Sequence, residues 1–294
     1  MIYFTDELLK YCEENNTYLW EIVLEDELEV SNDSKEEIYK KLSEMIEVMK
    51  NSANTYLDKD SKTGFGLIDG YAKQANEYAR KGNSFLGEKN VRTMAMAFST
   101  LELSSSMGRI VASPTAGSSG IIPAVIARYR MEEPDVTDEK LIEALLTAVG
   151  VGKIIGRFAN FSGAEGGCQA ECGSAAAMAS SALVYLKDGS LEESLNAASI
   201  AIVNILGLVC DPVAGLVEYP CTFRNASGAI NAILSADLAM AGIKSLVPFE
   251  EVCQALNDVG ESMSFRLKET ALGGIAATRT GERIKKEFYE KHNE

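Results

Sequence analysis

The sequence predicts an all-α protein: a compact bundle of helices rich in Ala, Gly and Ser, with cysteines carried in loops. Two observations lead to this class. Apolar residues recur at helical spacing through long segments without turn signals, and strict alternation of apolar and polar residues over a strand length is hard to find. The chain also lacks a good series of strands alternating with helices, so a parallel nucleotide-binding sheet is not predicted.

The first clear helix is predicted over residues 34–50. Ser34 and Glu37 form a capping-box pattern, in which each side chain accepts a hydrogen bond from the backbone of the other residue. Apolar residues from Ile38 to Met49 then follow at helical spacing. A second helix is predicted over 88–107, where no turn residue interrupts the pattern.

Three later helices are predicted from their start signals. Thr137, followed by two acidic residues, starts a helix that we expect to run to about Gly150. Ser190 and Glu193 mark another start, and Pro248 lies at the start of a third helix, where proline is favoured.

Composition divides the chain near residue 90. Segment 1–90 is predicted to be an N-terminal helical and loop region packed on the core, with most of its loops in the glycine-containing stretch 51–90. Segment 91–294 is predicted to be the helical core, in which small residues let helix backbones approach closely. One continuous domain is equally compatible with this pattern.

Charge and hydropathy exclude several classes of partner. The 28 basic and 43 acidic residues give a net charge of −15, which argues against a nucleic-acid or anionic-membrane partner. The N-terminal residues MIYFTDELLKYCEENN lack the basic and apolar regions of a signal peptide. Asn204, Asp211 and Pro212 interrupt the longest apolar run, so no membrane span is predicted. We expect a cytoplasmic protein.

Four of the six cysteines gather in two short segments, GCQAECG (167–173) and VCDPVAGLVEYPC (209–221). A reducing cytosol disfavours disulfides, so clustered cysteines there point to metal binding or catalysis. Cys12 and Cys253 lie in helical segments without partners, and we interpret them as small buried apolar residues.

The spacing of the clustered cysteines favours an iron–sulfur group over zinc. Cys168 and Cys172 share one helix face, with Glu165 and Glu171 nearby. The ten residues between Cys210 and Cys221 do not fit a zinc knuckle, whereas cysteine spacings in iron–sulfur proteins vary widely. Zinc would often recruit histidine, and the only one is His292. Inert buried thiols remain the third interpretation.

Two further features bear on chemistry. SPTAGSSGIIPAV (113–125) places hydroxyl residues and glycines before a helix, which suits either an anion cradle or a simple helix connection. With a single histidine near the end, a Ser–His–Asp or Cys–His nucleophile cannot be assembled. Acid–base work would fall to Lys, Glu, Asp, Tyr, a metal-bound group or another polypeptide.

Taken together, these segments resemble a known family. SPTAGSSGIIPAV, SGAEGGCQAECGSAAAM, CDPVAGLVEYPC and ETALGGIAAT come in the order found in the alpha chain of bacterial iron–sulfur-dependent L-serine dehydratase. The resemblance covers roughly residues 20–280. It implies a helical protein whose oxygen-sensitive [4Fe–4S] cluster, without pyridoxal phosphate, eliminates water from L-serine to give pyruvate and ammonia.

The resemblance also assigns roles to residues. It implies that Cys168, Cys210 and Cys221 are the three cluster ligands, and that Cys172 is a neighbour or a spare thiol. It further implies that one loop holds the substrate carboxylate, through Ser113, Thr115, Ala116, Gly117 and Ser118. Lys153 is a candidate for the base, with a residue of a partner chain, or a surface lysine without a role, as the alternatives.

Two departures from the family imply a partner. Single-chain members carry an N-terminal region with a Ser-Ser-His-Thr motif, which this sequence lacks, and some end in a cysteine that reaches the cluster, whereas this sequence ends in FYEKHNE. Both match the split enzyme, in which a separate beta chain supplies the missing region. We therefore expect an alpha–beta complex.

Three other functions remain open from the sequence. An L-cysteine desulfidase-like lyase would share the ligand pattern. A pyridoxal-phosphate dehydratase could use the Ser/Gly loop for phosphate, but it would need a Schiff-base lysine in an α/β fold. A non-catalytic scaffold or redox-sensing subunit could use the cysteines as a switch.

Overall fold

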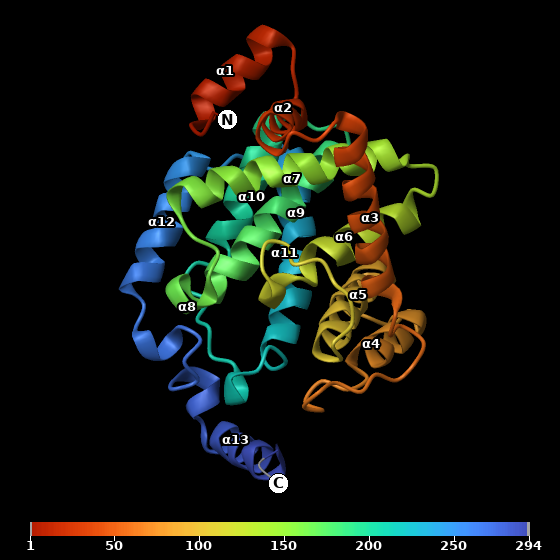
Figure 1. Ribbon diagram of the computed structural model, residues 1–294, viewed down its shortest axis with the longest axis vertical. Helices are drawn as coiled ribbons and strands as arrows, with labels where there is room; N and C mark the ends of the chain where they lie inside the picture. Colours follow the sequence, from red (N-terminus) through yellow and green to blue (C-terminus); the bar gives the residue numbers. More distant parts are fainter. Residues whose placement is uncertain (1, 293–294) are drawn as a thin grey trace.

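The computed structural model describes residues 2–292 and confirms the all-α class. Within these residues there is no β-strand, and the β-type pairing is an isolated bridge between Cys210 and Lys268. The α-helices, shown in Figure 1, are α1 (Thr5–Asn15), α2 (Leu19–Ser31), α3 (Lys35–Asn54), α4 (Tyr71–Arg80), α5 (Gly87–Ser105), α6 (Ile121–Glu132), α7 (Asp138–Phe158), α8 (Gly163–Gly166), α9 (Ser174–Leu186), α10 (Leu191–Val203), α11 (Cys221–Met240), α12 (Phe249–Ser262) and α13 (Arg279–His292). Short helical turns lie at Ala116–Ser118, Gln169–Gly173, Val213–Gly215, Phe265–Leu267 and Gly274–Ala277.

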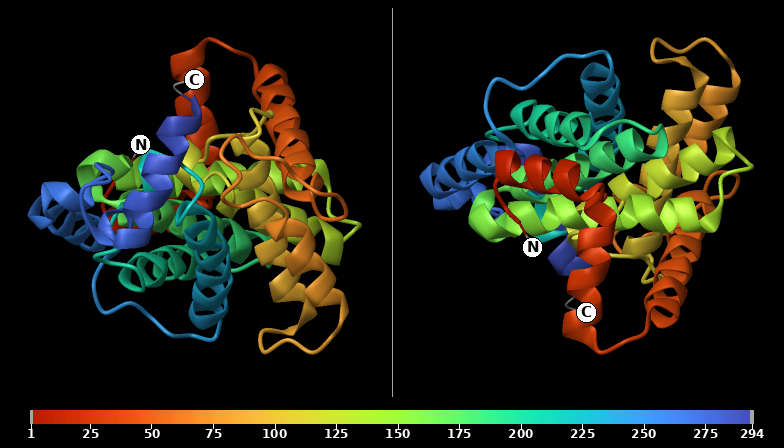
Figure 2. Two further views of the ribbon diagram at one scale, coloured as in Figure 1. Left: turned by 90° about the horizontal axis from the view of Figure 1, so that it is seen from below. Right: turned by 90° about the horizontal axis from the view of Figure 1, so that it is seen from above.

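Helix α9 forms the centre of the bundle. It packs against α7, α10 and α11, and Figures 1 and 2 show it enclosed by these helices. Its sequence, SAAAMASSALVYL, is almost entirely buried. Alanine and serine have small side chains, so neighbouring backbones can approach α9 closely, as the composition predicts.

The N-terminal helices lie against this core. Helix α2 packs on α7, and α3 packs on α5, α6 and α7. One cluster of buried apolar side chains contains Leu8 and Ile46 together with Ile122 and Ile155. The division at residue 90 stays a prediction.

The predicted helix starts are confirmed. The Ser34 hydroxyl accepts from the Glu37 amide at 3.2 Å, and the Glu37 carboxylate accepts from the Ser34 amide at 2.8 Å. Ser190 and Glu193 form the same pair of bonds, at 3.2 and 2.7 Å. Pro248 precedes the first residue of α12.

One predicted boundary is wrong. Helix α7 does not end near Gly150 but continues to Phe158, because its glycines serve packing. A β-carbon at Gly150 would lie 2.7 Å from Leu19 Cγ of α2, and one at Gly152 would lie 3.1 Å from Met178 Cε of α9. The glycine-containing stretch 51–90 holds the connection 55–70 and the turn 81–86, as expected of the main place for loops, and it also contains α4.

No helix among residues 2–292 is long and apolar enough to cross a membrane. Residues 293 and 294 of the FYEKHNE tail lie outside the described residues.

Two buried carboxylates hold the connection between α3 and α4. Glu102 of α5 accepts from the Ala72 amide at 2.9 Å, and Glu218 accepts from the amides of Leu67 at 2.9 Å and Phe65 at 3.2 Å. Glu102 is fully buried, and this burial raises the pKa of its carboxyl group to about 7. The connection is therefore fixed by acceptors from distant parts of the chain.

Replacing Glu102 tests this burial. Between its ordinary pKa of 4.5 and its folded pKa of about 7, the unfolded state loses the Glu102 proton first, so rising pH destabilises the folded state. We expect the unfolding free energy of Glu102→Gln, relative to the wild type, to increase from about pH 5 to about pH 7. Urea unfolding at several pH values measures it.

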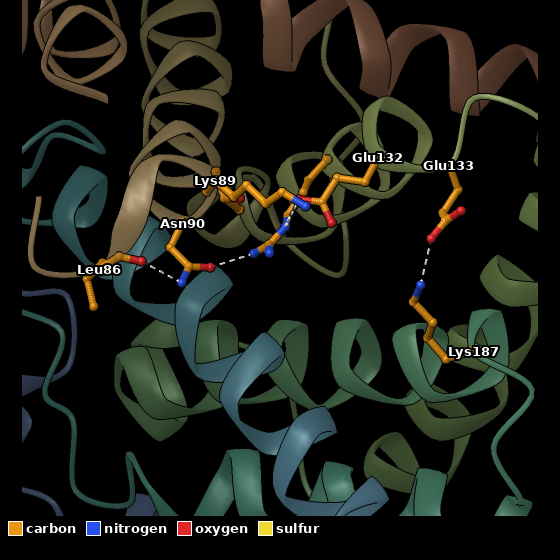
Figure 3. Close-up of polar contacts among 8 residues, drawn as sticks. Leu86, Lys89, Asn90, Glu132, Glu133 and Lys187 are labelled. Atoms are coloured by element: carbon orange, nitrogen blue, oxygen red, sulfur yellow. Dashed lines mark hydrogen bonds and ion pairs between the residues drawn. The ribbon is translucent and has the colours of Figure 1, made fainter. Parts of the chain in front are cut away.

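The matched control is Glu133→Gln, which removes an exposed carboxylate that pairs with Lys187 at 2.8 Å (Figure 3). The hydrogen bond from Lys187 lowers the pKa of Glu133, so this variant is expected to show no such increase. A difference between Glu102→Gln and the wild type that does not depend on pH would contradict the assignment.

Candidate metal centre

Four buried thiols from three segments form the centre of the site. Cys168 directly precedes the wide helical turn Gln169–Gly173, which contains Cys172 and leads into α9. Cys210 lies in the loop after α10, and Cys221 is the first residue of α11. The exposed fractions of Cys168, Cys172, Cys210 and Cys221 are 0, 1, 2 and 4%. The fold thus brings the two predicted cysteine segments to one buried place.

The tightest group differs from the predicted ligand set. Ligand atoms of Cys168, Glu171 and Cys210 all lie within 4.8 Å of one another, and Cys168 Sγ lies 3.6 Å from Cys172 Sγ. Cys221 is not part of the 4.8 Å group. Its thiol pKa is raised, first by burial and second by the negative charge of Cys168. The set of Cys168, Cys210 and Cys221 as ligands therefore stays a prediction.

Glu171 is the site residue to which sequence reasoning assigned no role. Its carboxylate accepts a hydrogen bond from Thr115 Oγ1 at 2.7 Å. Two glycines leave room for it, because a β-carbon on Gly117 or Gly163 would lie 2.6 or 2.7 Å from a Glu171 oxygen. Burial and then the charge of Cys168 raise the pKa of Glu171 to about 7. The sequence feature that pointed to Glu171 is its position directly before Cys172.

The loop predicted to hold a carboxylate lies against this group and contacts Glu171. Asn225 of α11 fixes the loop: its Nδ2 donates to the Gly117 carbonyl at 2.7 Å, and its Oδ1 accepts from the Gly120 amide at 2.8 Å. The same Nδ2 donates to the Cys221 carbonyl at 2.9 Å. Asn225 therefore connects the loop to the first turn of α11, where Cys221 lies.

The remaining loop residues lie within the same turn. The Ser118 hydroxyl is buried and lies 3.2 Å from Thr115 Oγ1. Ala116 begins the helical turn, and its carbonyl accepts from Ser119 Oγ at 2.8 Å. The buried Ser113 hydroxyl, which precedes a cis peptide to Pro114, has no hydrogen-bond partner among the described residues.

A buried ion pair borders the thiols. Arg224 Nη2 of α11 lies 2.5 Å from Asp211 Oδ1, and Asp211 Oδ2 accepts from the Ile275 amide at 2.6 Å. Hydrogen bonds from the Cys172 and Cys210 thiols, and then the Arg224 charge, hold the pKa of Cys168 well below its usual range. The thiolate form, which binds metals, is therefore favoured at Cys168.

A pocket of about 610 Å³ opens beside this ion pair. Its lining includes Cys172, Asn204, Tyr219, Arg224 and Ser227. The pocket is large enough for a small polar molecule and reaches the thiol group through Cys172.

Lys153, the predicted base, takes part in a different contact. Its Nζ donates to Asp26 Oδ2 of α2 at 2.9 Å. Within residues 2–292, no hydrogen bond or ion pair joins Lys153 to the cysteines or to Glu171. Through this contact, Lys153 links α7 to α2.

The comparisons with known proteins agree with one another. The family model described as "Serine dehydratase alpha chain" matches residues 14–276. The L-serine dehydratase alpha chain of Peptoniphilus asaccharolyticus is 51% identical over 286 residues, which is 96% of each chain. The probable L-serine dehydratase alpha chain of Bacillus subtilis is 40% identical and covers 96% of this chain and 94% of its own length.

A longer relative matches as well. The L-serine dehydratase of Streptomyces coelicolor is 35% identical over 92% of this chain, but the match covers only 60% of that protein. The family model and the first two relatives cover nearly the whole chain, including every cysteine segment of the site. The chain belongs to the serine dehydratase alpha chain family.

Proposed function

We propose that this chain is the alpha subunit of an L-serine dehydratase, which eliminates water from L-serine to give pyruvate and ammonia. The observation that carries the proposal is the meeting of Cys168, Cys210 and Glu171 within 4.8 Å, beside the Thr115 loop, in a member of this family. The alpha chain of P. asaccharolyticus, which is 51% identical, is named an L-serine dehydratase.

The proposed metal group is a [4Fe–4S] cluster held by Cys168, Cys210 and Cys221. The donor set suits it, because the thiols are buried and come from separated segments, as iron–sulfur ligands often do. Arg224 Nη1 is buried beside them without a hydrogen-bond partner among the described residues, which suits sulfur acceptors there. When bound, the group would supply a Lewis acid that makes the β-hydroxyl a better leaving group.

The loop from Ser113 to Ser118 would orient the substrate. Thr115 already binds a carboxylate, that of Glu171, at 2.7 Å. A substrate carboxylate at this loop would compete with Glu171 for the same hydroxyl donor. Binding would then free Glu171 Oε1 from Thr115, and the fixed loop would hold the substrate for reaction.

The α-proton needs an acceptor close to the loop. We propose the Glu171 carboxylate, because it accepts from Thr115 of the loop and also belongs to the 4.8 Å group with Cys168 and Cys210. Lys153 remains the alternative, although its ammonium group pairs with Asp26. The resulting aminoacrylate would tautomerise and hydrolyse in water without further help from the chain.

A second polypeptide is part of the proposal. The two relatives that match over nearly their full length are both named alpha chains. The S. coelicolor relative has 40% of its length outside its match to this chain, because the match covers 60% of it. We propose that a beta chain supplies a corresponding region and that the active enzyme is an alpha–beta complex.

The ligand assignment predicts unequal effects of four cysteine replacements. We expect Cys168→Ala, Cys210→Ala and Cys221→Ala to lose bound iron and sulfide, because each removes a thiolate ligand. Cys172→Ala is the matched control, since it removes an equally buried thiol, 3.6 Å from Cys168 Sγ. Iron and sulfide per chain are measured after anaerobic purification. Equal loss in all four variants would refute the assignment.

The choice of proton acceptor predicts different rates. In the alpha–beta complex, Glu171→Gln should lower kcat per bound iron by about 10² to 10⁴, the usual contribution of an acid–base group. Lys153→Met should lower it less than about tenfold, because the Asp26 contact lies outside the site. Pyruvate formation measures both rates, and the opposite ranking would establish Lys153 as the base.

The partner assignment predicts a low activity for the alpha chain alone. We expect the beta chain to raise pyruvate formation from L-serine at least about 100-fold, because it completes the site. The same assay with L-cysteine tests the alternative substrate. Full activity of the isolated alpha chain would contradict the requirement, and faster turnover of L-cysteine would change the assigned substrate.

A further inference from the structure

Arg224 occupies an unusual position among the charged residues of the site. Its side chain is 11% exposed, and that of its partner Asp211 is 2% exposed. Nη2 is used in this ion pair, at 2.5 Å, whereas Nη1 is buried and has no hydrogen-bond partner among the described residues. A buried N–H group almost always has an acceptor, so an unpaired one calls for an explanation.

The groups around Arg224 indicate what the acceptor is. Arg224 lines the same pocket as Cys172 and lies on α11 close behind Cys221, so thiol sulfur atoms are its neighbours. The Asp211 carboxylate is already satisfied by Nη2 and by the Ile275 amide. A sulfur atom that carries negative charge is therefore the acceptor that this site offers.

The ion pair also connects the ligand segments. Asp211 directly follows Cys210, and Arg224 lies three residues after Cys221, one turn along α11. Because Asp211 Oδ1 holds Nη2 of the planar guanidinium, the direction of the other N–H groups is restricted. The orientation of Nη1 thus depends on the same two segments that carry the predicted ligands.

We propose that Arg224 donates a hydrogen bond from Nη1 to a sulfur atom of the metal group held by Cys168, Cys210 and Cys221, and that its charge stabilises the reduced form of that group. This inference rests on the proposed function. Arg224 is a positioning residue here, because it acts on the group through sulfur and not on the substrate. Hydrogen bonds to sulfur and nearby charge are among the factors that set iron–sulfur reduction potentials.

The test is a dithionite titration of the anaerobically reconstituted alpha–beta complex, followed by electron paramagnetic resonance, with iron and sulfide counted in each sample. Arg224→Gln removes the charge and should shift the midpoint potential to more negative values. Arg224→Lys keeps a charge but loses the planar fork, and its shift should be smaller. Equal potentials in the wild type and both variants, at equal iron content, would overturn the inference.

The matched control is Arg128→Gln. Arg128 of α6 is 15% exposed and pairs with Glu132 at 3.2 Å, in the contact network around Asn90 shown in Figure 3. It belongs to a similar ion pair outside the cysteine group, so the potential should not change. A shift in Arg128→Gln as large as that in Arg224→Gln would overturn the inference, because the effect would then not be specific.

Loss of the group gives a separate outcome. If both Arg224 variants fail to retain iron, their unfolding midpoints are measured without iron and compared with that of the wild type. Unchanged midpoints support the loss of a contact to the metal group. Lowered midpoints overturn the inference in favour of a purely structural role. A wild-type complex without iron and sulfide would overturn the cluster assignment itself. A loaded wild type with unshifted variants would overturn only the role of Arg224.

Discussion

The buried ion pair between Asp211 and Arg224 is the contact on which the cysteine site depends. Two charges taken out of water are costly, and their attraction compensates only when the remaining donors and acceptors are also satisfied. The Ile275 amide, 2.6 Å from Asp211 Oδ2, meets part of this need. The pair therefore joins the Cys210 loop, α11 and the turn Gly274–Ala277 into one unit.

The site has a second carboxylate, that of Glu171. The ion pair holds its segments rigidly, whereas the Glu171 carboxylate is able to change its partner. It lies between the Thr115 hydroxyl and the thiols of Cys168 and Cys210. Gly117 and Gly163 provide the space, since neither site could accept a β-carbon without moving the carboxylate. In the proposed function a substrate carboxylate takes the place of Glu171 at this loop, so substrate binding would be coupled to the position of Glu171.

The helical core holds these groups in fixed positions relative to one another. Helix α9 continues directly from the wide turn that follows Cys168 and contains Cys172, and α7, α10 and α11 bury it on its sides. Close packing of small side chains leaves little room for α9 to shift, because any displacement would create clashes or voids. A site built on such a helix keeps its geometry better than one built on loops alone.

The sequence by itself determined the fold class, the helix starts at Ser34 and Ser190, and the family, because periodicity, capping and motif order are local properties of the chain. It could not determine that α7 passes through Gly150, because that glycine is set by its contact with Leu19 of another helix. Nor could it place Glu171 against Thr115, pair Lys153 with Asp26, or orient Arg224 beside Cys168. These contacts join residues far apart in the chain, and only the packing of the helices brings them within reach of one another.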